Sequence, residues 1–142
     1  MKVLVDTNIV LDVLLKQEPF CGDSLVILHL ASGGKINGFF AAVSMTNIFY
    51  ILRGRLKDSS KVYHYLNELN SLFTVAPITE TTISHALSLR WKDFEDAVQY
   101  SAAKENGAEL IITRNKDDFY SSDIPCMTPS EFIAYLKEKE NE

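Results

Sequence analysis

Short apolar runs alternate with segments of helical periodicity along the chain. The apolar runs predict buried strands over residues 3–5, 38–43, 72–76 and 109–113, with a short fifth strand over 125–127. Apolar spacing and capping residues predict helices over residues 9–15, 22–31, 44–52, 58–69, 79–89, 93–106 and from 128 onward. Strands separated by helices favour parallel pairing with right-handed crossovers. The pattern therefore predicts an α/β fold, a three-layer α/β/α sandwich with a central, mostly parallel sheet.

Length and composition bound the kind of protein. A chain of 142 residues is close to the usual size of one domain, so we expect residues 1–142 to form a single domain with a frayed tail from about 137 to 142. The apolar stretches are too short to span a membrane, and the N-terminus lacks the pattern of a secretion signal. Cys21 and Cys126 have no motif spacing, which argues against a disulfide framework. We expect a cytoplasmic protein.

The net charge of −5 argues against binding of nucleic acid through overall electrostatic attraction. It does not exclude a nuclease, because clustered carboxylates that hold a cation also make a protein acidic. Charge alone therefore leaves the function open.

The first strand ends abruptly in the polar trio Asp6, Thr7 and Asn8. In open α/β sheets, ligands bind at the carboxyl edge of the strands, where Asp6 is expected to lie. We expect Thr7 and Asn8 to cap the helix that follows, and Ser44 to cap the helix over residues 44–52. The alternative is that Asp6 merely ends a strand and begins a helix, since all three residue types are favoured caps.

Three further polar segments stand at predicted strand ends or helix starts, namely residues 44–47, 93–96 and 113–118. In a parallel sheet, these segments and Asp6 converge at one edge. Asp93 and Asp96 are three residues apart, so they point the same way on a helix. They also suit plain structural roles, Asp93 as an N-cap and Asp96 as an acid favoured by the helix dipole.

Several carboxylates that lie close together repel one another unless a cation sits among them. Hard oxygen ligands suit Mg²⁺ or Mn²⁺, and a metal so placed can activate water in an attack on a phosphodiester. No Ser-His-Asp or Cys-His set competes for this role. The chemistry predicted from these residues is metal-assisted hydrolysis.

The ordered set of segments resembles the PIN-domain ribonucleases, a family that includes the toxins of many bacterial toxin–antitoxin pairs. The matching segments are residues 5–8, 43–47, 93–97 and 112–115, which together span most of the chain. The resemblance implies a metal-dependent endoribonuclease that cuts RNA to leave a 3′-hydroxyl and a 5′-phosphate. It implies that Asp6 and Asp96 are acidic metal ligands and that Thr7, Asn8, Ser44 and Thr113 shape the site. It also implies an antitoxin protein as a possible partner and a homodimer.

Two positions depart from the common family pattern. Asn47 and Asn115 stand where the family commonly has acids, so each keeps an oxygen ligand but removes a negative charge. We expect Asn47 and Asn115 to bind the metal directly or through water, and Asp93 to assist as a further acidic ligand in catalysis. The set resembles a PIN subgroup with this Asn-containing pattern.

Basic residues remain for the substrate. Arg114 and Lys116 flank the expected site and are predicted to bind RNA phosphates, which would position a strand without reading its sequence. The cluster at Arg53 and Arg55 is better interpreted as a solvated helix end.

Two other functions stay open. Asn47 and Asn115 motivate a PIN-like module that binds RNA or protein without turnover. A phosphotransfer enzyme with Asp6 as its nucleophile is less favoured, because position 8 is Asn instead of a second Asp and no convincing Lys partner follows.

Overall fold

Five parallel strands form one sheet in the computed structural model, which describes residues 1–142. The strands are β1 (Lys2–Val5), β2 (Asn37–Ala41), β3 (Thr74–Ala76), β4 (Leu110–Ile112) and β5 (Cys126–Met127), in the spatial order β3-β2-β1-β4-β5. Each pair of neighbours is parallel. The first strand therefore lies in the middle of the sheet, flanked on both sides.

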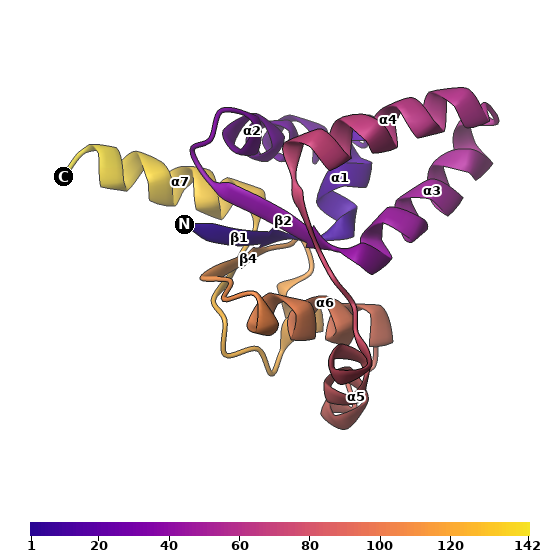
Figure 1. Cartoon of the computed structure of the whole chain (residues 1–142). Coiled ribbons are helices and arrows are strands. Elements are labelled where there is room, and N and C mark those ends of the chain that lie inside the picture. Colours follow the sequence, from indigo (N-terminus) through magenta and orange to yellow (C-terminus); the bar gives the residue numbers. More distant parts are fainter.

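Helices cover both faces of the sheet (Figure 1). One face carries α1 (Thr7–Leu14), α2 (Cys21–Ser32), α3 (Ala42–Leu56), α4 (Ser59–Leu72) and α7 (Pro129–Glu140). The other face carries α5 (Glu80–Leu89) and α6 (Phe94–Glu105). The predicted three-layer α/β/α sandwich is confirmed, and its sheet is parallel throughout. None of the helices combines the length and the apolar character that a membrane-spanning segment requires.

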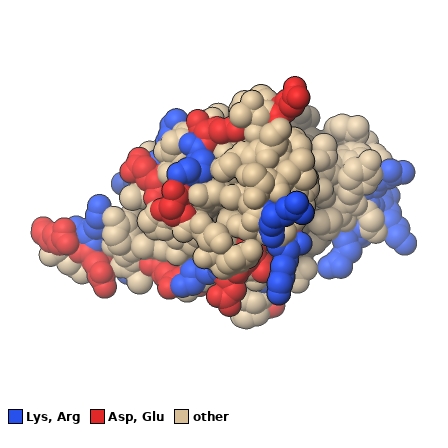
Figure 2. Space-filling model, turned by 90° about the horizontal axis from the view of Figure 1, so that it is seen from below, with Lys and Arg blue, Asp and Glu red and all other residues tan.

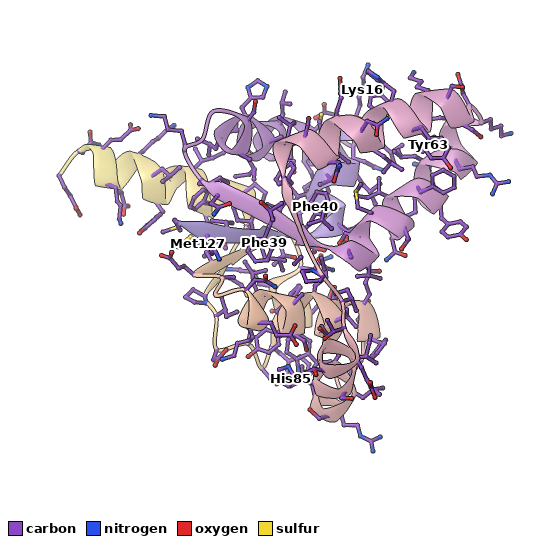
Figure 3. The ribbon with its side chains drawn as sticks, viewed as in Figure 1. Lys16, Phe39, Phe40, Tyr63, His85 and Met127 are labelled. Carbon is purple, nitrogen blue, oxygen red and sulfur yellow. The ribbon has the colours of Figure 1, made fainter.

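The alternation of side chains along the strands divides the core in two. Val3 and Val5 pack beneath the larger helical layer, whereas Leu4 between them packs against the layer of α5 and α6. In β2, Phe40 and Phe39 point to opposite faces in the same way (Figure 3). Because both faces are buried, the strands are continuous apolar runs without polar alternation.

Most of the predicted helix starts are confirmed by their caps. The side chains of Asp58, Thr79, Asp93 and Thr128 each accept a hydrogen bond from a backbone N–H in the first turn. The last helix continues through Glu140, past the point where fraying was expected.

The starts of α1 and α3 were predicted incorrectly. Thr7 and Asn8 lie inside α1 and do not cap it, because the N-cap position is Asp6, whose side chain makes no capping bond. Ser44 is a buried residue within α3, which already begins at Ala42. In both helices the hydroxyl that was expected to cap the backbone instead bonds to another side chain, as described below.

The carboxyl ends of β1, β2 and β4 meet at one edge of the sheet. There the chain passes from β1 directly into α1 and from β2 directly into α3, and β4 leads toward the short 3₁₀ helix η1 (Lys116–Phe119). The first turn of α6 reaches the same edge from the opposite layer (Figure 1). Four separate stretches of sequence thus surround a common point.

Candidate active site

A pocket of about 350 Å³ opens at this edge of the sheet. Its polar groups are acids, amides and the hydroxyls of Thr7 and Tyr50, and no Lys, Arg or His side chain contributes to it. The carboxylates are Asp6, Asp93, Glu95, Asp96 and Asp118. The predicted convergence of distant acidic segments is therefore present, and no basic side chain balances their charge within the pocket.

Asp6 forms the floor of the pocket. It directly follows β1 and is only 3% exposed. The Thr113 hydroxyl donates to its Oδ2 at 2.8 Å, and the Gln99 amide donates to its Oδ1 at 3.1 Å. Burial raises the pKa of Asp6 above its ordinary value of 3.8, although these hydrogen bonds partly counter the effect. The carboxylate is thus held in a fixed orientation in a place that disfavours its charge.

Asp96 lies beside Asp6 in the first turn of α6 and is 8% exposed. Burial, followed by the charges of Asp6 and Asp93, raises the pKa of Asp96 from 3.8 to about 8. A shift in this direction marks a carboxyl that lacks a compensating positive charge. Strongly perturbed acids in a cleft are typical of functional sites.

Asp93 stands at the exposed mouth of the pocket. Its Oδ1 accepts a hydrogen bond from the Asp96 backbone N–H at 3.1 Å, so the structural role as N-cap of α6 is present. It also lines the pocket together with Asp96, as the shared helix face predicts. The two roles are compatible because the cap uses only one carboxylate oxygen.

A buried hydroxyl pair lies beside the carboxylates, and one of its members also bonds to the opposite helical layer. The hydroxyls of Thr7 and Ser44 lie 2.6 Å apart, and the Thr7 hydroxyl also contacts Oε1 of Glu95 at 3.1 Å. These bonds connect α1, α3 and α6 across the pocket wall. Thr7, Ser44 and Thr113 therefore hold the site together through hydrogen bonds, while Asn8 lines the pocket directly.

Gln99 contacts the acids of the site but was not predicted as a site residue from the sequence. Its side chain is fully buried, and its amide nitrogen lies 3.1 Å from Asp6 Oδ1 and 3.4 Å from Asp96 Oδ1. The signal available in the sequence was its position three residues after Asp96, which puts both on one side of the helix.

Asn47 and Asn115, the predicted amide ligands of the metal, both line the pocket. Asp118, from η1, adds an acid on the side of Asn115. No three His, Cys, Asp or Glu side chains are grouped closely enough to enclose a metal ion by themselves. The donors are nevertheless all oxygen atoms, the type that a hard divalent cation prefers, and the raised pKa values indicate a place suited to positive charge.

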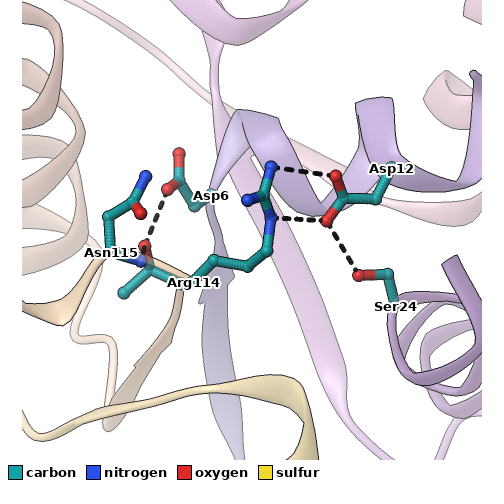
Figure 4. A network of polar contacts seen from close by, with 6 residues as sticks. Asp6, Asp12, Ser24, Arg114 and Asn115 are labelled. Atoms are coloured by element: carbon teal, nitrogen blue, oxygen red, sulfur yellow. Dashed lines mark hydrogen bonds and ion pairs between the residues drawn. The ribbon is translucent and has the colours of Figure 1, made fainter. Parts of the chain in front are cut away.

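Arg114, which was predicted to flank the site and bind substrate, does not line the pocket. Its Nε and Nη2 donate to Asp12 at 2.8 and 3.0 Å, and Figure 4 shows the guanidinium extending toward Asp12, away from Asp6 and Asn115. Asp12 is 1% exposed and also accepts a hydrogen bond from the Ser24 hydroxyl. A buried carboxylate needs a positive partner, and Arg114 provides it. The guanidinium further stacks on Phe20, with Cζ 4.0 Å from the ring centre.

Lys116 is likewise engaged elsewhere, since its Nζ lies 2.9 Å from the Glu131 carboxylate at the start of α7. Both groups of this ion pair are exposed to solvent. It is therefore an accessible surface pair outside the pocket lining. Neither basic residue that was predicted for substrate binding contributes to the pocket wall.

Other basic side chains gather at the far end of the α3–α4 hairpin. Arg53, Arg55 and Lys57 are exposed at the last turn and C-cap of α3. Figure 2 shows Lys and Arg side chains concentrated at this end of the molecule, and Figure 1 shows the hairpin projecting beyond the carboxyl edge of the sheet. The basic cluster thus lies on the same side of the molecule as the acidic pocket.

Known proteins share both the sequence pattern and the fold. The chain is 27% identical over 136 residues to Ribonuclease VapC1 of Aquifex aeolicus, covering 92% of each chain. A toxin–antitoxin complex from Klebsiella pneumoniae contains a chain with 22% identity and a TM-score of 0.65, covering 89% of this chain and 97% of that one. The structure of VapBC2 from Rickettsia felis bound to a promoter DNA fragment gives 16% identity and a TM-score of 0.69, with 90% and 98% covered.

The PIN domain family model matches residues 2–117. This match includes every residue that lines the acidic pocket except Asp118, which lies just beyond it. The chain therefore belongs to the PIN domain family.

Proposed function

We propose that this protein is a metal-dependent endoribonuclease, a hydrolase that cleaves phosphodiester bonds in RNA. The observation that carries the proposal is the pocket in which the buried carboxyls of Asp6 and Asp96 lie together without a basic neighbour. The likeness to Ribonuclease VapC1 over almost the whole chain supports the same activity.

Asp6 and Asp96 would hold the divalent cation, either Mg²⁺ or Mn²⁺. Asn47 and Asn115 would complete the ligand set through their amide oxygens, directly or through water, with Asp93 assisting from the mouth. A site with few protein carboxylates suits Mg²⁺, which keeps several waters and commonly binds substrate phosphate as well. When bound, the ion would activate a water and offset charge on the phosphate.

The protein's own contribution is to fix the acids in place. Thr113 and Gln99 hold Asp6, and the backbone of α6 presents Asp96 at the same point. Because these groups are buried, the site needs no reorganisation when substrate arrives. The expected products are a 3′-hydroxyl and a 5′-phosphate, as the family resemblance implies.

The RNA strand would be held by cations outside the pocket. With Arg114 and Lys116 engaged in ion pairs, the exposed cluster of Arg53, Arg55 and Lys57 is the better-placed source of phosphate contacts. Such contacts position a strand without reading its sequence. Substitution of this cluster would weaken RNA binding while leaving the acidic pocket intact.

A role as the toxin of a toxin–antitoxin pair is part of the proposal. Its support is the likeness to chains in solved toxin–antitoxin complexes. An antitoxin partner, a homodimer and a cytoplasmic location are proposed on the same kinship. Co-expression with the product of a neighbouring short reading frame, followed by co-purification, would test the partner.

Cleavage of single-stranded RNA tests the enzymatic proposal. We expect cleavage by the wild type in Mn²⁺, its loss in EDTA and its loss in Asp6→Asn. The matched control Asp117→Asn removes an exposed acid that does not line the pocket, so it should cleave normally. Cleavage that survives EDTA or Asp6→Asn would refute the mechanism. RNA binding without cleavage by the wild type would instead favour a binding module.

A further inference from the structure

Gln99 is the only amide side chain that contacts both buried carboxylates. It lies one turn after Asp96 on α6, and its nitrogen reaches one oxygen of Asp6 at 3.1 Å and one of Asp96 at 3.4 Å. The two acids come from elements about ninety residues apart in sequence, and this amide joins them directly. We propose that Gln99 is a positioning residue that holds Asp6 and Asp96 at the separation required for a divalent cation.

The side chain's burial is difficult to explain by packing alone. Gln99 has no exposed surface, and its Oε1 has no hydrogen-bond partner. A buried acceptor without a partner destabilises the fold, and an apolar side chain of the same length would avoid this. The neighbouring buried positions of α6 are indeed small or apolar, such as Ala97, Val98 and Ala102.

The unpartnered oxygen also shows what orients the amide. The amide nitrogen donates to one oxygen of Asp6 and to one oxygen of Asp96, so the amide oxygen faces away from both acids. Nothing on the oxygen side holds the group in place. The two carboxylates are therefore the partners for which this amide is placed.

The neutrality of Gln99 matters for its role. A Lys or Arg at this position would also bridge the carboxylates, but its charge would compete with a metal ion for the same site. An amide donates hydrogen bonds while leaving the negative charge of the pocket intact. Residues that orient metal ligands in this way typically contribute ten- to a hundredfold to metal affinity.

The test compares Mn²⁺ affinity in the wild type, Gln99→Met and Ser101→Ala, measured by calorimetric titration of the full chain. Met preserves length and lacks the donor. Ser101 is an equally buried polar residue of α6 whose hydroxyl bonds only to the Ala97 carbonyl of the same helix. We expect Mn²⁺ to bind Gln99→Met about ten- to a hundredfold more weakly and Ser101→Ala normally. Equal affinity in Gln99→Met and the wild type would overturn the inference.

A second measurement does not require metal and separates this inference from the proposed function on which it rests. Thermal midpoints in EDTA are compared for Gln99→Met, Asp6→Asn and the double variant. Residues in direct contact show non-additive effects, so the midpoint shift of the double variant should differ from the sum of the single shifts. Should the wild type bind no Mn²⁺, the proposed function fails, and this cycle still decides whether Gln99 holds Asp6 in place. Additive shifts would overturn it.

Discussion

Replacing Asp96 with Asn should stabilise the metal-free protein at neutral pH. Asp96 is 8% exposed, and its burial together with the nearby charges of Asp6 and Asp93 raises its pKa from 3.8 to about 8. The native side chain is therefore a source of instability that only a bound cation would remove. Asn keeps the shape and cannot carry the charge.

The size of the effect follows from the pKa difference between the two states. Between pH 4 and pH 8 the folded protein retains a proton on Asp96 that the unfolded chain releases, so the unfolding free energy of the wild type falls as the pH rises. One such proton changes the unfolding free energy by about 1.4 kcal/mol per pH unit. From pH 5 to pH 7 the stability of Asp96→Asn relative to the wild type should therefore increase by at most about 2.7 kcal/mol.

Urea denaturation in EDTA at pH 5, 6 and 7 measures this difference. The control Glu138→Gln makes the same charge change at an exposed position on α7 and should follow the wild type at each pH. Titrating groups that lie far from Asp96 are common to both proteins and cancel in the comparison. If Asp96→Asn tracks the wild type across this range, the carboxyl is ionised without strain and the reasoning about its burial is wrong.

Three further substitutions test other parts of the structure. Arg114→Met should lower the unfolding free energy, measured by urea denaturation, by about 2–3 kcal/mol, because the substitution leaves the buried Asp12 carboxylate unpaired. Adding Asp12→Asn should restore part of this loss. An undiminished stability would mean that the ion pair is not formed in solution. Gly38→Ala should cost about 1–3 kcal/mol, since its Cβ would lie 2.9 Å from the Phe73 ring, and an unchanged Tm would contradict that packing. Thr128→Ala should cost about 1 kcal/mol through loss of the α7 cap, which equal urea midpoints would disprove.

Local patterns in the sequence were sufficient to predict the layers and most helix starts. The apolar run before Asp6 predicts a strand because β1 is buried on both faces, and Thr128 with Glu131 predicts a helix start because its capping box lies within four residues. The meeting of Asp6 with Asp96 was also predictable, since β1 ends at the carboxyl edge of the sheet and a helix that leads back to the start of a parallel strand, as α6 leads to β4, begins at that edge.

Side-chain partners that are distant in sequence could not be predicted in this way. Arg114 was predicted to bind substrate, but its side chain pairs with Asp12, which lies 102 residues away in the sequence. Ser44 resembled a cap, but its hydroxyl bonds to Thr7 across 37 residues. Gln99 gave no signal beyond its place on the helix. In each case the hydrogen-bond partner of a buried polar side chain comes from a distant part of the chain. The partner therefore cannot be identified from the neighbouring residues in the sequence.

Titration of Mn²⁺ into the metal-free wild type and into Asp6→Asn tests most directly whether distant acidic segments form one cation site. We predict saturable binding to the wild type and a loss of about tenfold or more in affinity for Asp6→Asn, which removes a charged ligand. Equal uptake by the two proteins, or no uptake by the wild type, would contradict this prediction.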